Sequence, residues 1–321
     1  MKDQNGFVYL SDAVLSGLGI GAADVIACIE KAVLAKSNNV LWTAPKAAFM
    51  PGDGRYMMAT LAAADDPQII SVKSVIVSPR NPERGMSGIN GAIMLLDSET
   101  GELKAVMDAN WVTAIRTAGL SAVVARRLAN PNSKSIAFIG CGVQAHSHLE
   151  AFSQLFPITE LRAVGRGQAK VDQFCDTARS MGLAATACAS AQEAMDGADL
   201  IVSSITLSYD VDPFLDARWL KPGAFAAITD LALPWIPAGM GAFETVIIDD
   251  LEQEKSSPKP MIDSALVCGD LTDLVTGKIA STFSPDQRAA FVFRGIAIGD
   301  FALAALAYER AMAVGKGTRV S

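Results

Sequence analysis

Residues 135–145, SIAFIGCGVQA, decide the fold of this chain. The apolar run 135–139 is typical of a buried strand, and it leads directly into a G-x-G-x-x-A turn that opens a helix. Gly140 permits the tight turn, Gly142 lets the backbone approach a pyrophosphate, and Ala145 lets the helix pack close to the strand. An anion would bind at the helix N-terminus. The stretch therefore predicts a dinucleotide site, the alternative being a glycine turn with only a structural role.

After this turn, short apolar runs alternate with segments of helical periodicity. This alternation is the signature of βαβ units, so we expect an α/β fold with a doubly wound parallel sheet of the Rossmann type. The expected strands are residues 135–139, 161–164, 199–203, 224–228 and 245–248, and the expected helices lie near 144–154, 168–180, 190–195 and 216–219.

The sequence before the turn has a different pattern. A short strand and two helices, which end near Lys36, precede β-rich runs separated by Gly, Pro and Asn, as in an antiparallel or mixed sheet. The apolar, alanine-rich residues 286–313 predict one or two helices that return to this first domain. The expected strands are 7–10, 46–50, 55–60, 69–77 and 90–96, followed by a helix at 111–128.

Composition limits the classes of function. Half of the 321 residues are hydrophobic and 19% are charged. No apolar run reaches the roughly 18 residues of a membrane span, so we expect a soluble globular protein. The net charge of −7 argues against nucleic acid as a partner. Five widely spaced cysteines without a C-x-x-C pair give no sign of a zinc site, and with an N-terminus that lacks an export signal they favour the cytoplasm.

The choice of nucleotide depends on the end of the second parallel strand. The acid at the usual spacing, Glu160, precedes strand 161–164 and would lie at the wrong end of the sheet. The right end carries Arg166 between two glycines, and a guanidinium there pairs well with a 2′-phosphate. We therefore expect NADP(H) to be favoured and NAD(H) to be accepted. The alternative is that Arg166 is an exposed loop residue without influence on the nucleotide.

The two histidines do not form a metal pair. His146 and His148 are two residues apart and cannot share one helix face, so we expect structural or solvent-facing roles. Proton transfer then falls to Lys or Asp.

Several motifs together resemble the ornithine cyclodeaminase/mu-crystallin family. The resemblance spans the whole chain and implies a homodimer. It also implies a substrate-binding and dimerisation domain, residues 1–118 and 300–321, into which a dinucleotide-binding domain, residues 119–299, is inserted. The matching motifs are Gly140-Cys141-Gly142-Val143-Gln144-Ala145, Ile115-Arg116-Thr117-Ala118, Asn81-Pro82 with Arg84-Gly85, Leu96-Asp97 with Thr100-Gly101, and Phe291 to Asp300 with Tyr308-Glu309-Arg310-Ala311.

The resemblance implies roles for four charged residues. The family clamps the carboxylate of an amino or imino acid between basic residues, which correspond here to Lys46, Lys73 and Arg116. Lys73 interrupts the apolar run 69–77, so it is either exposed on one strand face or buried with a partner. The family's catalytic aspartate corresponds to Asp230 at the carboxyl end of a parallel strand, unless this residue only caps a turn.

One departure from the family bears on the reaction. Cyclodeaminases carry a glutamate where this chain has Met57, and without a carboxylate the distal amine of a diamino acid has no partner. Arg55 suggests instead a second anionic group on the substrate, or it is a surface residue at a turn.

The leading hypothesis is reversible hydride transfer between a nicotinamide nucleotide and C2 of a small α-imino acid, giving an L-amino acid. Candidate substrates are iminosuccinate, a cyclic ketimine such as pyrroline-2-carboxylate, and pyruvate with ammonia. The alternatives are an ornithine cyclodeaminase-type lyase and a non-catalytic NADP-binding protein of the crystallin type. We expect catalytic roles for Lys73 and Asp230, substrate contacts from Lys46, Arg55, Lys73 and Arg116, and cofactor contacts from Arg116, Thr117, Gly140, Gly142, Val143, Gln144, Arg166, Ser203, Ser204 and Asp230.

Overall fold

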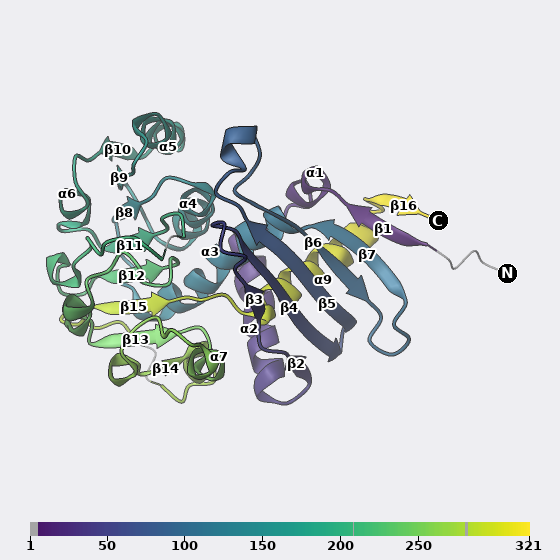
Figure 1. Ribbon diagram of the computed structural model, residues 1–321. Helices are drawn as coiled ribbons and strands as arrows, with labels where there is room; N and C mark the ends of the chain where they lie inside the picture. The colour runs from purple at the N-terminus through teal and green to yellow at the C-terminus, as the bar shows by residue number, and fades with distance from the viewer. Residues whose placement is uncertain (1–5, 208, 280–281) are drawn as a thin grey trace. The chain divides into compact units, whose positions relative to one another are not determined.

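The computed structural model describes residues 6–207, 209–279 and 282–321. The chain divides into two compact units (Figure 1). The first unit contains the chain up to Arg116 together with Ile296–Ser321, and the second contains Thr117–Gly295. Helix α3 (Ala109–Leu128) is continuous across the sequence boundary between them. The second unit is therefore inserted into the sequence of the first.

A parallel sheet forms the centre of the second unit. Its strands follow the spatial order β10-β9-β8-β11-β12-β15-β13-β14, and adjacent strands run parallel. The chain order reverses between β8 and β11, and sheets of this kind bind ligands outside the carboxyl ends of the strands at such a switch point. The strands are β8 (Ser135–Ile139), β9 (Glu160–Val164), β10 (Ala184–Ala187), β11 (Leu200–Ser203), β12 (Phe225–Ile228), β13 (Thr245–Ile248), β14 (Gly269–Asp270) and β15 (Ala289–Val292).

Helices cover both faces of this sheet. Successive side chains of β8 point to opposite faces. Phe138 meets Phe174 of α5 edge-on, with ring centroids 5.0 Å apart, whereas Ile139 packs in a core with Met195 of α6. The predicted Rossmann fold is therefore confirmed. The helices of this unit are α4 (Val143–Leu155), α5 (Gln168–Ser180), α6 (Ala191–Met195), α7 (Leu251–Ser256) and α8 (Leu271–Val275), with 3-10 turns at Ala217–Trp219, Pro237–Ala242 and Ser264–Leu266.

The helix predicted over residues 286–313 is wrong in its first part. Strand β15 occupies Ala289–Val292 between β12 and β13, and helix α9 (Ala297–Ala313) begins only after this strand. A four-residue strand that is buried on both faces shows no alternation of polar and apolar residues. Its periodicity therefore does not distinguish it from a buried helix.

The first unit contains a mixed sheet. Its strand order is β16-β1-β7-β6-β5-β4-β2, with β3 also paired to β4. Strand β1 lies parallel to β7, whereas the pairs from β7 to β2 are antiparallel. The β4-β5 hairpin places Thr60 directly opposite Lys73. The strands are β1 (Phe7–Leu10), β2 (Leu41–Thr43), β3 (Ala47–Phe49), β4 (Tyr56–Asp65), β5 (Gln68–Val77), β6 (Ile89–Leu96), β7 (Leu103–Asp108) and β16 (Thr318–Val320), and the short helices α1 (Asp12–Ser16) and η1 (Pro82–Arg84) lie in this unit as well.

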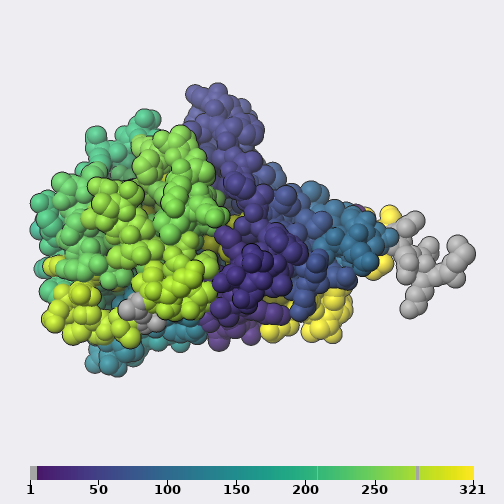
Figure 2. All heavy atoms as spheres, turned by 90° about the horizontal axis from the view of Figure 1, so that it is seen from below, coloured from purple at the N-terminus to yellow at the C-terminus, as the bar shows by residue number. Residues whose placement is uncertain are grey.

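Two helices from opposite ends of the chain cover one face of this mixed sheet. Helices α2 (Ala22–Ser37) and α9 pack against each other, and α9 contacts β4, β5 and β6 (Figure 1). Purple and yellow segments of this unit, from the start and the end of the chain, are both visible in Figure 2. The buried residues of α9 are apolar or small except for Asp300. Within the described ranges, no helix has the length and apolar character needed to cross a membrane.

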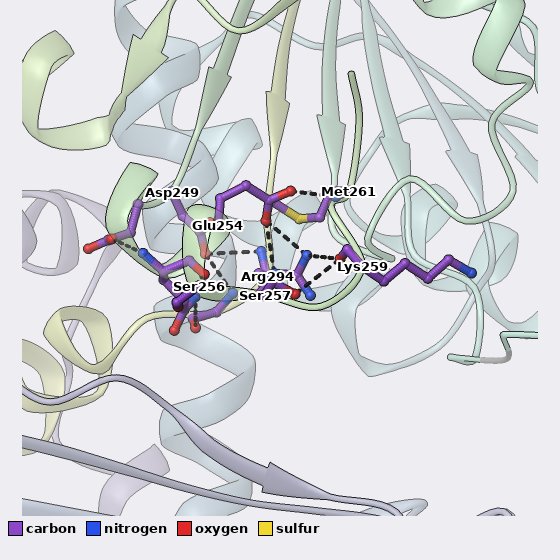
Figure 3. A network of polar contacts seen from close by, with 10 residues as sticks. Asp249, Glu254, Ser256, Ser257, Lys259, Met261 and Arg294 are labelled. Atoms are coloured by element: carbon purple, nitrogen blue, oxygen red, sulfur yellow. Dashed lines mark hydrogen bonds and ion pairs between the residues drawn. The ribbon is translucent and has the colours of Figure 1, made fainter. Parts of the chain in front are cut away.

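A polar network holds the segment where the chain leaves the parallel sheet (Figure 3). The Asp249 carboxylate, at the end of β13, accepts hydrogen bonds from the backbone N–H groups of Arg294 at 2.9 Å and Gly295 at 2.6 Å. The Arg294 guanidinium pairs with Glu254 of α7 at 2.8 Å and donates to the Lys259 carbonyl at 2.8 Å. The backbone that follows β15 is therefore fixed just before α9 begins.

Candidate functional site

The glycine turn of the second unit is built for a close approach of backbone and ligand. Gly140 has a φ of +98°, and a Cβ there would lie 2.6 Å from the Ser204 carbonyl oxygen. Gly142 precedes α4 without a side chain to cap the helix, and a Cβ on it would meet no atom within 4 Å. Val143 at the first helical position is 62% exposed. The helix N-terminus therefore faces open space that an anion could fill.

The other predicted nucleotide contacts lie on the same unit, except for Arg116, which belongs to the first unit. Arg166 is exposed in the turn between β9 and α5. Glu160 is the first residue of β9, at the opposite end of the strand, where it accepts a hydrogen bond from Arg162 at 2.7 Å. The Ser204 N–H donates to the Ile139 carbonyl at 2.9 Å, which places Ser204 beside the glycine turn. Thr117 is buried in α3, and Gln144 is the second residue of α4.

Asp230 lies at the carboxyl edge of the parallel sheet, two residues after β12. Its carboxylate accepts hydrogen bonds from the Ser203 hydroxyl at 3.1 Å and from the Ile205 N–H at 3.3 Å. The Trp235 indole N–H in turn donates to the Ser203 oxygen at 2.9 Å. Burial raises the pKa of Asp230 to about 6, and the two hydrogen bonds only partly oppose this rise. A buried acid that titrates near neutral pH is suited to proton transfer.

The loop after Asp230 has an unusual backbone. Leu231 and Ala232 adopt left-handed conformations, with φ values of +59° and +55°. These conformations disfavour residues with a Cβ, so the backbone beside Asp230 is strained. The following turn is nonetheless closed, because the Trp235 N–H donates to the Ala232 carbonyl at 3.0 Å.

A cluster of buried charges lies within the first unit, between its sheet, α3 and α9. The Asp300 Oδ1 atom is 2.6 Å from the Lys73 Nζ and 2.9 Å from the Arg116 Nε. Its other oxygen, Oδ2, accepts a hydrogen bond from the Thr60 hydroxyl at 3.0 Å. Lys73 and Asp300 are each 1% exposed, and Arg116 is 6% exposed. Of the two alternatives for Lys73, burial with a partner is therefore the observed one.

Asp300 is a residue of this cluster that the sequence analysis did not single out. Burial lowers the pKa of Lys73 to about 8, although the neighbouring Asp300 opposes this shift, while Arg116 and Lys46 add to it. Burial acts to raise the pKa of Asp300, but Arg116 and Lys73 outweigh this effect and lower it. A signal was present in the sequence, since an aspartate inside an otherwise apolar helix requires a cationic partner.

The other two basic residues lie outside this buried group. Lys46 is half-buried, and its Nζ lies 6.0 Å from the centre of the Tyr56 ring. Arg55 forms an ion pair with Asp53 at 2.7 Å on the same turn, with 42% of its side chain exposed. Lys73 and Arg116 are thus brought together by the fold, whereas Arg55 is held on the surface by a neighbour in sequence.

A match to a family model adds to this geometry: the model of the ornithine cyclodeaminase/mu-crystallin family covers residues 16–315. The chain belongs to the ornithine cyclodeaminase/mu-crystallin family. Ketimine reductase mu-crystallin of Mus musculus is 29% identical over 257 residues, 79% of each chain. Delta(1)-pyrroline-2-carboxylate reductase of Bacillus cereus is 27% identical over 271 residues, 81% of this chain and 82% of the relative. An archaeal alanine dehydrogenase dimer with bound NAD has the same fold, with a TM-score of 0.87, 24% identity and coverage of 98% and 99% of the two chains.

Strand β4, which contains Met57, places other side chains on the face of Lys73. Side chains alternate along a strand, and Thr60 is the residue of β4 directly opposite Lys73. Tyr56 and Met58 share the face of Thr60, whereas Met57 lies on the other face. None of the β4 residues on the Lys73 face is an acid.

The histidines of this family member have structural contacts. Burial lowers the pKa of His148 to about 4, so the ring is neutral. Its Nδ1–H donates to the Gln144 carbonyl at 2.8 Å, and its Nε2 accepts from the Ser121 hydroxyl at 2.9 Å. The ring of His146 packs edge-on against Phe174, with centroids 4.8 Å apart. His148 thus ties the first turn of α4 to α3. Across the described part of the chain, no group of three or more His, Cys, Asp or Glu residues is placed to hold a metal ion.

We predict that Asp230→Asn stabilises the folded protein at pH 7.5. Because the folded pKa of about 6 lies above the unfolded value of 3.8, stability is lost as pH rises through 6, where the buried carboxyl ionises. The variant escapes this loss, so its free energy of unfolding in urea should exceed that of the wild type by about 1–3 kcal/mol at pH 7.5, and the difference should vanish near pH 4.

Asp199→Asn is the matched control for this measurement. Burial acts to raise the pKa of Asp199, but hydrogen bonds from the Lys221 ammonium and the backbone of Lys134 and Ser135 lower it. This variant should therefore destabilise the protein at pH 7.5. If Asp230→Asn were less stable than the wild type at pH 7.5, this would contradict the raised pKa of Asp230 and the cost of its buried charge.

Proposed function

We propose that the protein is an NAD(P)H-dependent oxidoreductase that reduces a small α-imino acid to an L-amino acid. The observation that carries the proposal is the buried pair of cations, Lys73 and Arg116, on one unit of a chain whose other unit has a Rossmann sheet with an open glycine turn. Relatives named ketimine reductase and pyrroline-2-carboxylate reductase support the same chemistry. The first unit then binds substrate, and the second binds the dinucleotide.

The residues present fit a dinucleotide. The space beside Gly142, which a Cβ would enter without meeting an atom, suits a pyrophosphate, and the N-terminus of α4 offers N–H donors there. Gly140, Val143, Gln144, Ser203 and Ser204 would complete the contacts of this turn. When bound, the reduced nicotinamide supplies the hydride. Arg166, exposed after β9, would pair with a 2′-phosphate, which favours NADP(H) while NAD(H) remains accepted.

The charges of the first unit favour an anionic substrate. Lys73 and Arg116 place an ammonium and a guanidinium beside one carboxylate, that of Asp300. A substrate carboxylate would accept hydrogen bonds from both cations. Lys46 near Lys73 adds to the attraction. A second anionic group on the substrate, as in iminosuccinate, would have to replace Asp53 as the partner of Arg55.

Two residues are suited to deliver the proton that accompanies the hydride. Lys73, with a pKa of about 8, is still mainly charged at pH 7 and is therefore a proton donor. Asp230, with a pKa of about 6, is mainly ionised at pH 7 and donates only from its protonated fraction. The two assignments differ in their pH dependence.

The side chains of β4 that lie on the same face of the sheet as Lys73 favour reduction over cyclodeamination. Thr60, Met58 and Tyr56 offer no carboxylate for the distal amine of a diamino acid. Cyclic ketimine carboxylates, iminosuccinate, and pyruvate with ammonia are the substrates to compare.

The outer face of the mixed sheet supports a homodimer. One row of directly paired residues crosses five strands and is apolar throughout: Tyr9, Val106, Met94, Val72 and Leu61. Tyr9, Met94 and Leu61 are each more than 40% exposed. An apolar row of this length on a sheet face fits a second copy of the chain.

Free thiols at all five cysteines agree with a cytoplasmic location.

We predict net oxidation of NADPH or NADH by purified protein when a panel of α-imino acids is supplied. A cyclodeaminase would instead release ammonia from ornithine without net change in reduced nucleotide, and a non-catalytic protein would bind nucleotide without turnover. Either of these results would contradict the proposed reduction.

The pH dependence identifies the proton donor. In the reductive direction, kcat should fall tenfold per pH unit above the pKa of the donor, that is above about 8 for Lys73 or above about 6 for Asp230. Lys73→Met or Asp230→Asn, whichever removes the donor, should lower kcat by about 100-fold or more. Near wild-type turnover in both variants would show that neither residue transfers the proton.

We predict that Arg166→Asp lowers the preference for NADPH over NADH by about tenfold or more, because a carboxylate repels a 2′-phosphate that the guanidinium would pair with. The measurement is the ratio of kcat/KM for the two nucleotides. Arg179→Ala removes an exposed arginine of α5, paired with Asp176, and should leave the ratio unchanged. An unchanged ratio in Arg166→Asp would disprove the phosphate contact.

We predict that Leu61→Glu converts the dimer to a monomer, because it places a charge in the middle of the apolar row. The check is molar mass from light scattering over a range of concentrations. Met181→Glu, at an apolar residue of similar exposure in the second unit, is the matched control and should keep the mass of the wild type. A monomeric wild type would refute the proposed dimer.

A further inference from the structure

The two buried cations of the first unit contact the same carboxylate oxygen. The Asp300 Oδ1 accepts a hydrogen bond from the Lys73 ammonium at 2.6 Å and forms an ion pair with the Arg116 Nε at 2.9 Å. The second oxygen is held by the Thr60 hydroxyl at 3.0 Å, so the carboxylate cannot rotate without losing a contact. The register of the β4-β5 hairpin places Thr60 next to Lys73 on the same face. Four elements therefore determine the positions of the two cations.

Stability alone does not account for this arrangement. Removing charges from water is costly, and well-packed apolar residues often stabilise a core as well as a buried ion pair does. The surroundings of Asp300 on α9 are apolar, since Phe301, Ala302 and Leu303 follow it and are buried. A chain selected for stability only would place apolar side chains at all three positions, 73, 116 and 300, because removing the acid alone would leave two buried cations without a partner. The retained charges point to a role in the site that they form.

We propose that Asp300 is a positioning residue of the proposed reductase. Its carboxylate holds Lys73 and Arg116 at a fixed separation and orientation for the substrate carboxylate, and Thr60 in turn fixes the carboxylate of Asp300. This inference rests on the proposed function. Asp300 uses one of the three ammonium protons of Lys73, and two remain for a substrate. The side chain of Asp300 does not itself take part in the chemistry.

The same contact affects the protonation of Lys73. Among the residues that the structure describes, the charged groups that shift the pKa of Lys73 are Asp300 from α9, Arg116 from α3 and Lys46 from the segment before β3. Asp300 is the only acid among these, so without its charge Lys73 would lie buried beside two cations. The ammonium would then lose its proton at a lower pH.

The test compares Asp300→Asn, which keeps the shape but removes the charge, with Thr60→Val and Thr60→Ser. The first readout uses ligand-free protein labelled with 15N at lysine Nζ, in which the Lys73 signal is assigned by its loss in Lys73→Arg and titrated with pH. In Asp300→Asn the midpoint should fall by at least one pH unit. Asp24→Asn, which removes an acid from a half-exposed pair with Arg310 in the same unit, should leave the midpoint unchanged.

The second readout is steady-state kinetics with the imino acid that the panel identifies. Thr60→Val frees one carboxylate oxygen, so KM for the imino acid should rise about tenfold while KM for the nucleotide stays constant, and Thr60→Ser should restore it. This variant keeps the inference testable if Asp300→Asn does not fold. A Lys73 midpoint that is unchanged in folded Asp300→Asn, or an unchanged substrate KM in Thr60→Val, would overturn the role of Asp300.

The two readouts separate this inference from the proposed function. A shifted Lys73 midpoint in protein that reduces no imino acid would support the control of Lys73 by Asp300 and overturn the proposed reductase. Reductase activity with an unshifted midpoint would support the proposed function and overturn the role of Asp300.

Discussion

The burial of two cations with one carboxylate is the constraint on which the first unit depends. Lys73 is on a sheet strand, Arg116 is on α3, and the acid that compensates them is on α9, near the end of the chain. A buried cation without a partner would be strongly destabilising. The acid that pairs with both cations lies on the segment that returns to the first unit after the parallel sheet is complete.

Much of the fold could be predicted from local sequence, because its main elements are specified by short-range chemistry. The apolar run before Gly140 predicts a buried strand of a parallel sheet, and the pairing of β8 with β9 and β11 confirms it. Strand β15 was missed because four consecutive apolar residues are compatible with either a strand or a helix. Only the pairing with β12 and β13 distinguishes the two.

The candidate site was less predictable than the fold. Lys73 was recognisable as a charge within an apolar run, but its partner is 227 residues away in sequence, and no local pattern connects the two. For Arg55 the partner is close in sequence: Asp53, two residues earlier, pairs with it on the surface, and the sequence prediction of a substrate contact did not take this acid into account. A resemblance to a family names positions, whereas the distances between atoms decide which charges act together.

Strain and unfavourable charge in the second unit gather at the carboxyl edge of its sheet. Asp230 is buried, and Leu231 and Ala232 after it adopt left-handed conformations. Acidification from pH 6 to 4 removes the cost of the Asp230 charge, but over the same range the unfolded chain takes up a proton at His148, whereas the folded protein, with a pKa of about 4 there, does not. The effects of these two groups on the free energy of unfolding therefore have opposite signs.

The inserted order of the two units has a consequence for synthesis on the ribosome. The second unit is contiguous in sequence, so all of its strands are available once Gly295 has been added. The first unit cannot be completed until α9 has been synthesised. At elongation rates of about 5–20 residues per second, the time between the addition of Arg116 and the completion of α9 is roughly 10–40 s. During this interval Lys73 and Arg116 have no Asp300, and the sheet face that α9 will cover is open. The earliest residues of the chain are therefore among the last to reach their final structure.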